Sequence, residues 1–277
     1  MKCIIKNSAW QFRIPSLALS LILAACNLIN QQISHKLSHH LIEHIDDNFK
    51  KVEFCHMMPN TKKSDFAVIF LHGHQYPERP GAKIPLDKGI LNEFASQGYN
   101  AIAISIAGYG RSDGPADFSG PYSQNAVISV IKYLQSHNIK NIALIGVSRG
   151  AIIASMVATK EIGLSCMVLD AGFYDLAKLT DERTIGNLKK EASHEYNYLV
   201  NRSAIRHIDK IKTPALILHG YNDERASVEE AIEFYRKLME NKVEAQILIF
   251  SSGHHTPEKE TKTLRNLFLK KCFNFTS

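Results

Sequence analysis

The sequence predicts an α/β fold in which a mostly parallel β-sheet is covered by helices on both faces. Short, nearly continuous apolar runs alternate along the chain with segments of helical, amphipathic spacing. Strands that are apolar throughout are typical of parallel sheets, because both faces of such a sheet are buried. No internal repeat, low-complexity tract or Pro/Gly-rich linker divides the chain after the first fifty residues, so one main domain is expected.

The apolar runs have the length of buried strands, and most of them end in a turn that contains glycine or a polar residue. The predicted strands span residues 67–71, 101–106, 142–147, 167–169, 215–218 and 246–250. Between them, apolar side chains recur three and four residues apart, which indicates amphipathic helices. The predicted helices span residues 90–94, 125–134, 151–159, 228–239 and 259–270.

The segment from Gly172 to Arg206 is the longest stretch after residue 50 without a predicted strand. It is polar, with scattered Tyr and Leu residues that suit short helices. Because it connects two strands, we expect it to form a short helical cap over one edge of the sheet.

Composition limits the classes of protein that the chain can form. With 277 residues, 45% of them hydrophobic and 22% charged, the chain can bury a sizeable core, which excludes a disordered tail or a coiled coil. The formal charge of +6 is modest for this length, and no basic stripe interleaved with aromatic residues is present. Nucleic-acid binding is therefore not expected.

The first residues have the layout of an export signal. Lys2, Lys6 and Arg13 precede an uncharged, Leu-rich stretch over residues 14–29, and no acidic residue occurs before residue 43. A basic start followed by a short apolar run is typical of a secretory signal and is short for a transmembrane helix. An uncleaved anchor or a buried N-terminal helix remains the alternative interpretation.

The apolar run ends in Leu23-Ala24-Ala25-Cys26, which resembles a bacterial lipobox. The resemblance implies cleavage after Ala25, diacylglyceryl attachment to Cys26, and a lipid-anchored protein of the bacterial cell envelope. The expected organisation is therefore a signal peptide over residues 1–25, a linker over 26–48 and the main domain over 49–277, with its cap at about 172–206.

The remaining cysteines, Cys55, Cys166 and Cys272, show no metal-ligand spacing and no disulfide framework. Cys166 opens an apolar run and is expected to be a small buried hydrophobic residue. No metal site and no cofactor-binding motif is predicted.

Gly146-Val147-Ser148-Arg149-Gly150 joins a predicted strand to a predicted helix. In this context a G-x-S-x-G pentapeptide forms a tight turn that presents its serine as a nucleophile. A serine hydroxyl needs a histidine to take its proton, and the histidine needs a carboxylate to orient it. Ser148 is therefore the candidate nucleophile.

The partners of Ser148 are expected at the ends of later strands. Asp223 follows the strand over 215–218, and His254 and His255 follow the strand over 246–250. Asp170, which ends the strand over 167–169, is the alternative acid, and Asp223 as a mere helix-capping residue is a further alternative. Both histidines remain candidates for the base.

Four motifs in this order resemble those of the α/β-hydrolase superfamily: Leu71-His72-Gly73-His74, Gly108-Tyr109-Gly110-Arg111-Ser112-Asp113-Gly114-Pro115, the serine elbow, and His219-Gly220-Tyr221-Asn222-Asp223. Within the superfamily the chain looks most like esterases and the catalytic domain of prolyl-oligopeptidase-like hydrolases. The resemblance covers roughly residues 52–271. It implies backbone N–H groups of His74 and Arg149 as the oxyanion hole. It favours His255, which begins an H-x-P sequence, over His254, which follows Gly253.

The remaining polar residues of these motifs have structural interpretations. His72 and His219 are expected to bind loop backbone beneath the site, and Tyr109 is expected to pack within its loop. For the Arg149 side chain, a substrate carboxylate and an acidic neighbour both remain candidate partners.

The resulting hypothesis is a cofactor-independent serine hydrolase that cleaves a small carboxylic ester or thioester through an acyl-enzyme. A serine peptidase that acts on short peptides is the first alternative, because the same residues serve both reactions. The second is an anchored binding protein that keeps the fold without turnover.

Overall fold

The computed structural model describes residues 35–60, 64–192 and 196–273, which lie in one compact unit that starts at His35. The predicted signal segment over residues 1–25 and the predicted lipidation site Cys26 lie outside the described residues. Within the described part, no helix is long and apolar enough to span a bilayer.

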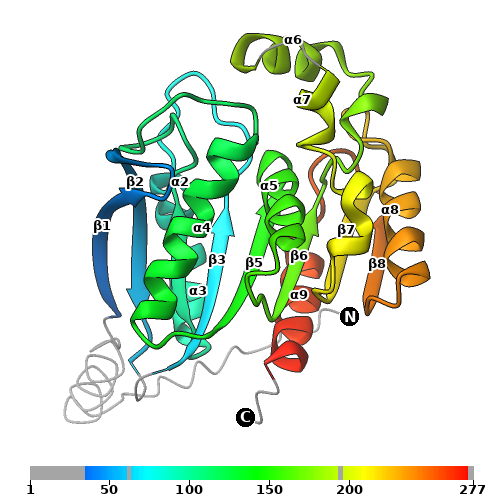
Figure 1. Cartoon of the computed structure of the whole chain (residues 1–277). Coiled ribbons are helices and arrows are strands. Elements are labelled where there is room, and N and C mark those ends of the chain that lie inside the picture. Colours follow the sequence, from blue (N-terminus) through cyan, green and yellow to red (C-terminus); the bar gives the residue numbers. More distant parts are fainter. Residues whose placement is uncertain (1–34, 61–63, 193–195, 274–277) are drawn as a thin grey trace, which may run out of the picture. The chain divides into compact units, whose positions relative to one another are not determined.

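An eight-stranded sheet with the order β1-β2-β4-β3-β5-β6-β7-β8 forms the centre of the unit (Figure 1). β1 and β2 pair antiparallel with each other, β2 pairs antiparallel with β4, and the remaining neighbours run parallel. The strands are β1 (Lys36–His44), β2 (Asp47–Met58), β3 (Phe66–Leu71), β4 (Asn100–Ile104), β5 (Asn141–Val147), β6 (Cys166–Asp170), β7 (Ala215–Gly220) and β8 (Ala245–Phe250).

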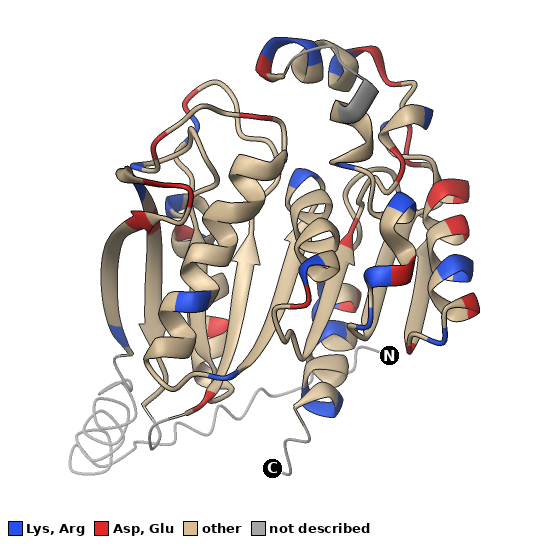
Figure 2. Ribbon diagram, viewed as in Figure 1, with Lys and Arg blue, Asp and Glu red and all other residues tan. Residues whose placement is uncertain are grey.

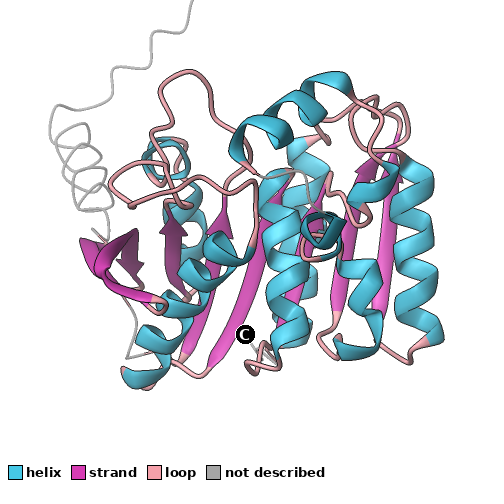
Figure 3. Ribbon diagram, turned by 45° about the horizontal axis from the view of Figure 1, so that its top comes forward, coloured by secondary structure: helices cyan, strands magenta, loops and turns pink. Residues whose placement is uncertain are grey.

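Helices cover both faces of this sheet, as predicted (Figure 3). The helices are α2 (Lys83–Asp87), α3 (Ile90–Ser96), α4 (Pro121–Ser136), α5 (Arg149–Val157), α6 (Glu182–Glu191), α7 (Tyr196–Val200), α8 (Val228–Glu240) and α9 (Glu258–Cys272). Short 3-10 segments η1 (Ala158–Lys160), η2 (Leu176–Lys178) and η3 (Ala204–Lys210) complete the order.

Alternation along the strands divides the apolar side chains into two cores. In β3, Ile69 and Leu71 face a core shared with α4, α5 and α8, whereas Val68 and Phe70 face a core shared with α3 and α9. The inner strands β3, β4, β5 and β7 carry no Lys, Arg, Asp or Glu (Figure 2). Both faces of these strands are buried, which explains the continuous apolar runs in the sequence.

The linker prediction over residues 26–48 is wrong from Lys36 onward, because β1 and the start of β2 occupy residues 36–44 and 47–48. The histidine-rich sequence hides the strand, since two of its inward positions, His40 and His44, are rings rather than aliphatic chains. His40 stacks on Phe54 at 4.5 Å between ring centroids, and His44 stacks on Tyr122 at 4.0 Å. Both imidazoles pack here as aromatic rings.

Two further sequence predictions can be compared with the fold. Cys166 is fully buried, as expected, and the three described cysteines are free. The segment from residue 172 to 206 contains only helices and turns in its described part, so the prediction of a helical connection is confirmed.

The cap formed by that segment is fixed to the main domain at both of its ends. Glu230 of α8 accepts hydrogen bonds from the backbone N–H groups of Tyr174 (2.7 Å) and Asp175. The Asp175 carboxylate in turn forms a 3.0 Å ion pair with Arg206 at the far end of the cap. Residues near the start of the cap are thereby bound to α8, and the last residue of the cap is bound to one of them.

Candidate active site

The candidate residues gather at the carboxyl edge of the sheet, where the parallel strands end. β3 leads to His72 and His74, β5 leads to Ser148, β7 leads to Asp223 and β8 leads to His254. Open parallel sheets place their sites at this edge, because the loops that follow the strands converge there. Residues separated by more than a hundred positions in sequence therefore share one pocket.

Ser148 lies at the turn between β5 and α5 with φ 52° and ψ −115°. This left-handed conformation is strained for a residue with a side chain, and it is typical of the nucleophile elbow. Gly150 permits the turn, because a Cβ at that position would collide with the carbonyl oxygen of Leu71 in β3. The Ser148 N–H donates to the carbonyl of Asp170 at 2.8 Å, which fixes the elbow to β6.

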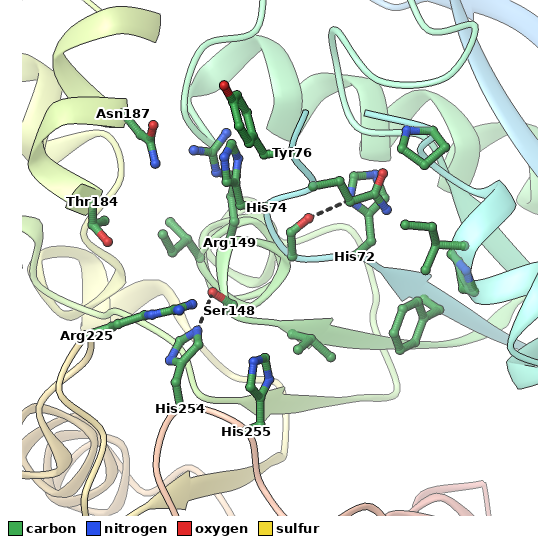
Figure 4. A pocket seen from close by; sticks show the side chains of 18 of the residues that line it. His72, His74, Tyr76, Ser148, Arg149, Thr184, Asn187, Arg225, His254 and His255 are labelled. Atoms are coloured by element: carbon green, nitrogen blue, oxygen red, sulfur yellow. Dashed lines mark hydrogen bonds between the residues drawn. The ribbon is translucent and has the colours of Figure 1, made fainter. Parts of the chain in front are cut away.

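His254 connects the serine to a carboxylate. Its Nε2 lies 2.9 Å from the Ser148 hydroxyl oxygen, and its Nδ1 lies 2.9 and 3.1 Å from the two carboxylate oxygens of Asp223 (Figure 4 shows the serine contact). The Asp223 side chain is fully buried. With a proton on Nδ1, the ring donates to Asp223 and presents a free Nε2 lone pair to the serine hydroxyl.

His255, the histidine that the sequence favours, does not make these contacts. Its ring lies 5.7 Å from that of His254, measured between centroids, and it lines the pocket beside the hydrogen-bonded chain. Two consecutive side chains of a loop point in different directions, so only one of them can reach both Ser148 and Asp223. In the structure it is His254 that forms hydrogen bonds with both Ser148 and Asp223. The sequence-based preference for His255 is corrected by this geometry.

Asp223 and Asp170, the two candidate acids, have different partners. Burial by itself would raise the pKa of Asp223, but hydrogen bonds from His254 and from the backbone N–H groups of Ala226 and Arg225 outweigh it and lower the pKa. Asp170 accepts a 2.9 Å hydrogen bond from the Thr256 hydroxyl, and burial raises its pKa to about 6. Asp223 caps no helix, since α8 begins after Ser227.

His72 and His219 bind loop backbone, as the sequence analysis expects. The Nδ1–H of His72 donates to the carbonyl of Gly73 (2.8 Å), and its Nε2 accepts from the N–H of Ile106 (3.2 Å). His219 Nε2 lies 2.8 Å from the carbonyl oxygen of Ala226, in the loop that carries Asp223. Burial lowers the pKa of His72 to about 4, so its ring stays neutral at neutral pH.

Arg149 is directed away from the reacting centre by an acidic neighbour. Its guanidinium forms a 2.7 Å ion pair with Glu191 at the end of α6 and donates to the Tyr109 hydroxyl at 3.1 Å. Tyr109 is buried within its loop, as expected, and its hydroxyl also lies 2.9 Å from His74 Nδ1. Of the two partners considered for Arg149, the structure shows the acidic one, and the ion pair is buried rather than on the surface.

The cap forms one wall of a pocket above Ser148. The pocket encloses about 520 Å³ and is lined by the loop after β3, the elbow, the loop that carries His254 and His255, and cap residues. Arg183, Thr184 and Asn187 of α6 belong to this lining, and Figure 4 shows Thr184 and Asn187 facing the elbow from the opposite wall. The predicted cap therefore borders the site.

Several residues at this site carry no signal in the sequence. Glu191 and Arg79, which meet Arg149 in one ion-pair cluster, lie in a polar helix and a polar loop without a motif. Arg225 follows the Asp223 motif but is not part of it. Within the residues that the structure describes, no group of His, Cys, Asp and Glu side chains is arranged to hold a metal ion.

Comparison with protein families and known sequences gives a consistent result. The model of the prolyl oligopeptidase family matches residues 93–276, more than half of the chain. The uncharacterized peptidase YtmA of Bacillus subtilis is 28% identical over 190 residues, which cover 64% of this chain and 72% of that protein. The acylamino-acid-releasing enzyme of Rattus norvegicus is 28% identical over 121 residues, which cover 42% of this chain and 15% of that enzyme.

Solved structures share the fold at low sequence identity. The esterase Pf2001 of Pyrococcus furiosus superposes with a TM-score of 0.67 at 23% identity, over 87% of this chain and 94% of the esterase. The acylaminoacyl peptidase of Pyrococcus horikoshii superposes with a TM-score of 0.71 at 17% identity, over 90% of this chain and 44% of the peptidase. The predicted α/β-hydrolase fold is thereby confirmed.

Proposed function

Because this chain belongs to the prolyl oligopeptidase family of serine hydrolases, we propose that it hydrolyses a carboxylic ester or thioester through an acyl-enzyme formed on Ser148. In this proposal His254 is the general base and Asp223 is the acid that orients it. The observation that carries the assignment is the continuous chain of hydrogen bonds from Ser148 through His254 to Asp223, with no atom pair longer than 3.1 Å.

In the first half-reaction the Ser148 oxygen attacks the substrate carbonyl while His254 Nε2 takes the hydroxyl proton. Asp223 accepts the Nδ1–H throughout and stabilises the imidazolium that forms. When the tetrahedral intermediate collapses, His254 gives its proton to the leaving oxygen or sulfur. In the second half-reaction water attacks the acyl-enzyme, His254 takes a proton from that water and returns it to Ser148, and the carboxylic acid leaves.

The oxyanion hole in this proposal consists of the backbone N–H groups of Arg149 and His74. Arg149 is the first residue of α5, where helix geometry leaves the N–H without an intrahelical acceptor. His74 follows β3 beside the elbow and lines the same pocket. Such N–H groups stabilise the negative oxygen of the intermediate more strongly than they stabilise the neutral carbonyl.

An ester or thioester is preferred over a peptide because the nitrogen of a peptide must be protonated before it can leave, and because a peptide demands tighter positioning. A peptidase on short substrates is the second candidate. The family match and the similarity to YtmA, described as a peptidase, favour that activity. The two activities share every residue of the hydrogen-bonded chain.

A fluorophosphonate probe and a substrate panel test the proposal. Wild-type protein should be labelled by the probe and should hydrolyse short p-nitrophenyl esters; the Ser148→Ala variant should do neither. Ser96→Ala, which changes an exposed serine of α3, is the matched control and should behave as wild type. Labelling that persists in Ser148→Ala would refute the assignment, and ligand binding without labelling of wild type would favour a non-catalytic binding protein. Parallel assays with thioesters and aminoacyl amides rank ester against peptide cleavage.

The cellular location is a separate part of the proposal. The basic start, the apolar run and Leu23-Ala24-Ala25-Cys26 support export, cleavage after Ala25 and a lipid on Cys26, which would anchor the hydrolase in the bacterial envelope. Intact-mass analysis of the membrane fraction should find a chain that begins at lipidated Cys26, and Cys26→Ala should release the protein from that fraction. Unmodified Met1 in the membrane-bound protein would contradict the anchor.

A further inference from the structure

Three cationic side chains line the pocket without a partner of their own. Arg183 lies on α6 of the cap, Arg225 lies in the loop that carries Asp223, and Lys88 lies between α2 and α3. In the part of the chain that the structure describes, none of the three side chains forms an ion pair. All three are exposed to solvent. They come from separate elements, so their charges lie around one pocket only in the folded protein.

The negative charge around the pocket does not balance them. Glu78 is the one carboxylate among the described residues that line the pocket. Arg149 also lines it, but the Arg149 charge meets Glu191, and Glu191 is shared with Arg79 at 2.8 Å. The pocket therefore keeps an excess of positive charge above the serine.

The pKa values of two histidines on opposite walls of the pocket are lowered in part by this positive charge. The pKa of His74 falls to about 4 because of burial, then because of Arg149 and Arg79, and to a smaller extent because of Arg183 and Arg225. Burial, His254, Arg225 and Lys88 lower the pKa of His255. Positive charge disfavours protonation of both rings, so both walls of the pocket lie within the field of the unpaired cations.

The Arg225 side chain reaches toward the serine. In Figure 4 its side chain runs from the wall beside His254 toward Ser148, with the guanidinium end directed into the pocket. Its backbone N–H separately donates to Asp223 at 2.9 Å. The loop position is thus fixed by the backbone, and the side chain is left to face the substrate.

We propose that the pocket takes esters or short peptides that carry a free carboxylate near the scissile bond, with Arg225 and Arg183 as the groups that bind it. This inference rests on the proposed hydrolysis and specifies its substrate class. A guanidinium presents two parallel N–H donors that match a carboxylate. A volume of about 520 Å³ leaves room for an acid group beyond a small acyl chain. The carboxylate can belong to the acyl part or to the leaving group.

Matched pairs of esters test the inference and separate the two sources of the carboxylate. For the acyl side, p-nitrophenyl hydrogen adipate is compared with its uncharged terminal amide. For the leaving-group side, 3-acetoxybenzoate is compared with 3-acetoxybenzamide. The measured quantity is the ratio of kcat/KM for the acid over the amide, corrected for spontaneous hydrolysis. We expect a ratio well above one for one of the two pairs, and a ratio that falls as NaCl is raised.

The variants Arg225→Gln and Arg183→Gln identify the groups responsible. Each should lower the acid-to-amide ratio by roughly fivefold through KM, as expected for a solvent-exposed charge contact. Arg225→Glu should lower the ratio further. Arg236→Gln, on the outer face of α8 and outside the pocket lining, is the matched control and should leave the ratio unchanged.

The outcomes separate this inference from the proposed function. If the neutral esters are hydrolysed but both ratios are one or lower and do not respond to the arginine variants, the substrate class is wrong and the hydrolase stands. If no ester is hydrolysed, the inference is tested by binding. Titration calorimetry then measures the affinity of the Ser148→Ala protein for adipate and for adipamide. Adipate that binds more tightly, and loses this advantage in Arg225→Gln, supports the inference, whereas equal binding overturns it.

Discussion

The guanidinium of Arg149 and the carboxylate of Glu191 form a buried 2.7 Å ion pair that joins the serine elbow to the last residue of α6. Glu191 also binds Arg79 in the loop after β3, and Arg149 also binds Tyr109, which contacts His74. One carboxylate of the cap therefore holds two loops around Ser148 in place. The cap and the loop that follows β3 are coupled through this cluster.

Glu191→Gln should destabilise the protein and slow turnover. The change leaves the buried Arg149 without its counter-charge, and removal of one partner from a buried pair costs about 3 kcal/mol. We expect that loss in the free energy of unfolding, measured by urea titration, together with a lower kcat for p-nitrophenyl acetate. Glu182→Gln, an exposed change on the same helix, should alter neither value; an equal effect in both variants would mean that the charge of α6, not the ion pair, matters.

His254→Ala should lower kcat/KM about 10⁴-fold, since the base that contacts Ser148 and Asp223 is lost. His255→Ala should stay within about fivefold of wild type, because that ring lines the pocket without touching either residue. Steady-state measurement of kcat/KM for both variants on one neutral ester shows which histidine is required. The reverse ranking would show that the loop rearranges before catalysis.

Asp223→Asn should lower kcat by about 10³- to 10⁴-fold, because an amide no longer holds the His254 tautomer. Asp170→Asn removes a carboxyl that binds Thr256 rather than His254. This substitution should leave kcat nearly unchanged. Both substitutions preserve shape, so a difference in kcat at equal thermal stability assigns the acid. Equal losses in the two variants would speak against Asp223 as the orienting group.

Glu230 should make the stability of the protein depend on pH. Burial raises the pKa of its carboxyl from 4.5 to about 7, although the N–H groups of Asp175 and Tyr174 oppose the shift. Because the folded pKa is the higher one, its contribution is complete below pH 4.5 and is lost as pH rises through about 7. The loss is on the order of 3 kcal/mol.

Thermal melts of wild type and Glu230→Gln at pH 4.5 and pH 8 measure this effect. The amide oxygen of Gln can still accept both N–H bonds but does not titrate. Wild type should therefore lose more stability than the variant between the two pH values. An equal loss of thermal stability between pH 4.5 and pH 8 in the two proteins would show that Glu230 does not control the pH dependence.

Much of this architecture could be predicted because its signals are local. The strands over 142–147 and 215–218 are apolar on both faces, and a G-x-S-x-G sequence between a strand and a helix is typical of a tight turn. β1 could not be predicted in the same way, because His40 and His44, which count as polar residues in a sequence pattern, occupy two of its inward positions. Their packing depends on Phe54 and Tyr122, which the chain supplies elsewhere.

The sequence by itself determined the fold class, the elbow serine and the edge of the sheet where its partners lie, since periodicity and turn chemistry act over a few residues. Only the tertiary structure showed that His254 rather than His255 contacts Ser148, and that Asp223 rather than Asp170 contacts His254, because each contact depends on where a side chain points at the end of a strand. The Arg149–Glu191 pair and the unpaired Arg183 and Arg225 also required it. Electrostatic contacts join residues that are distant in sequence, so they cannot be predicted from a local sequence pattern.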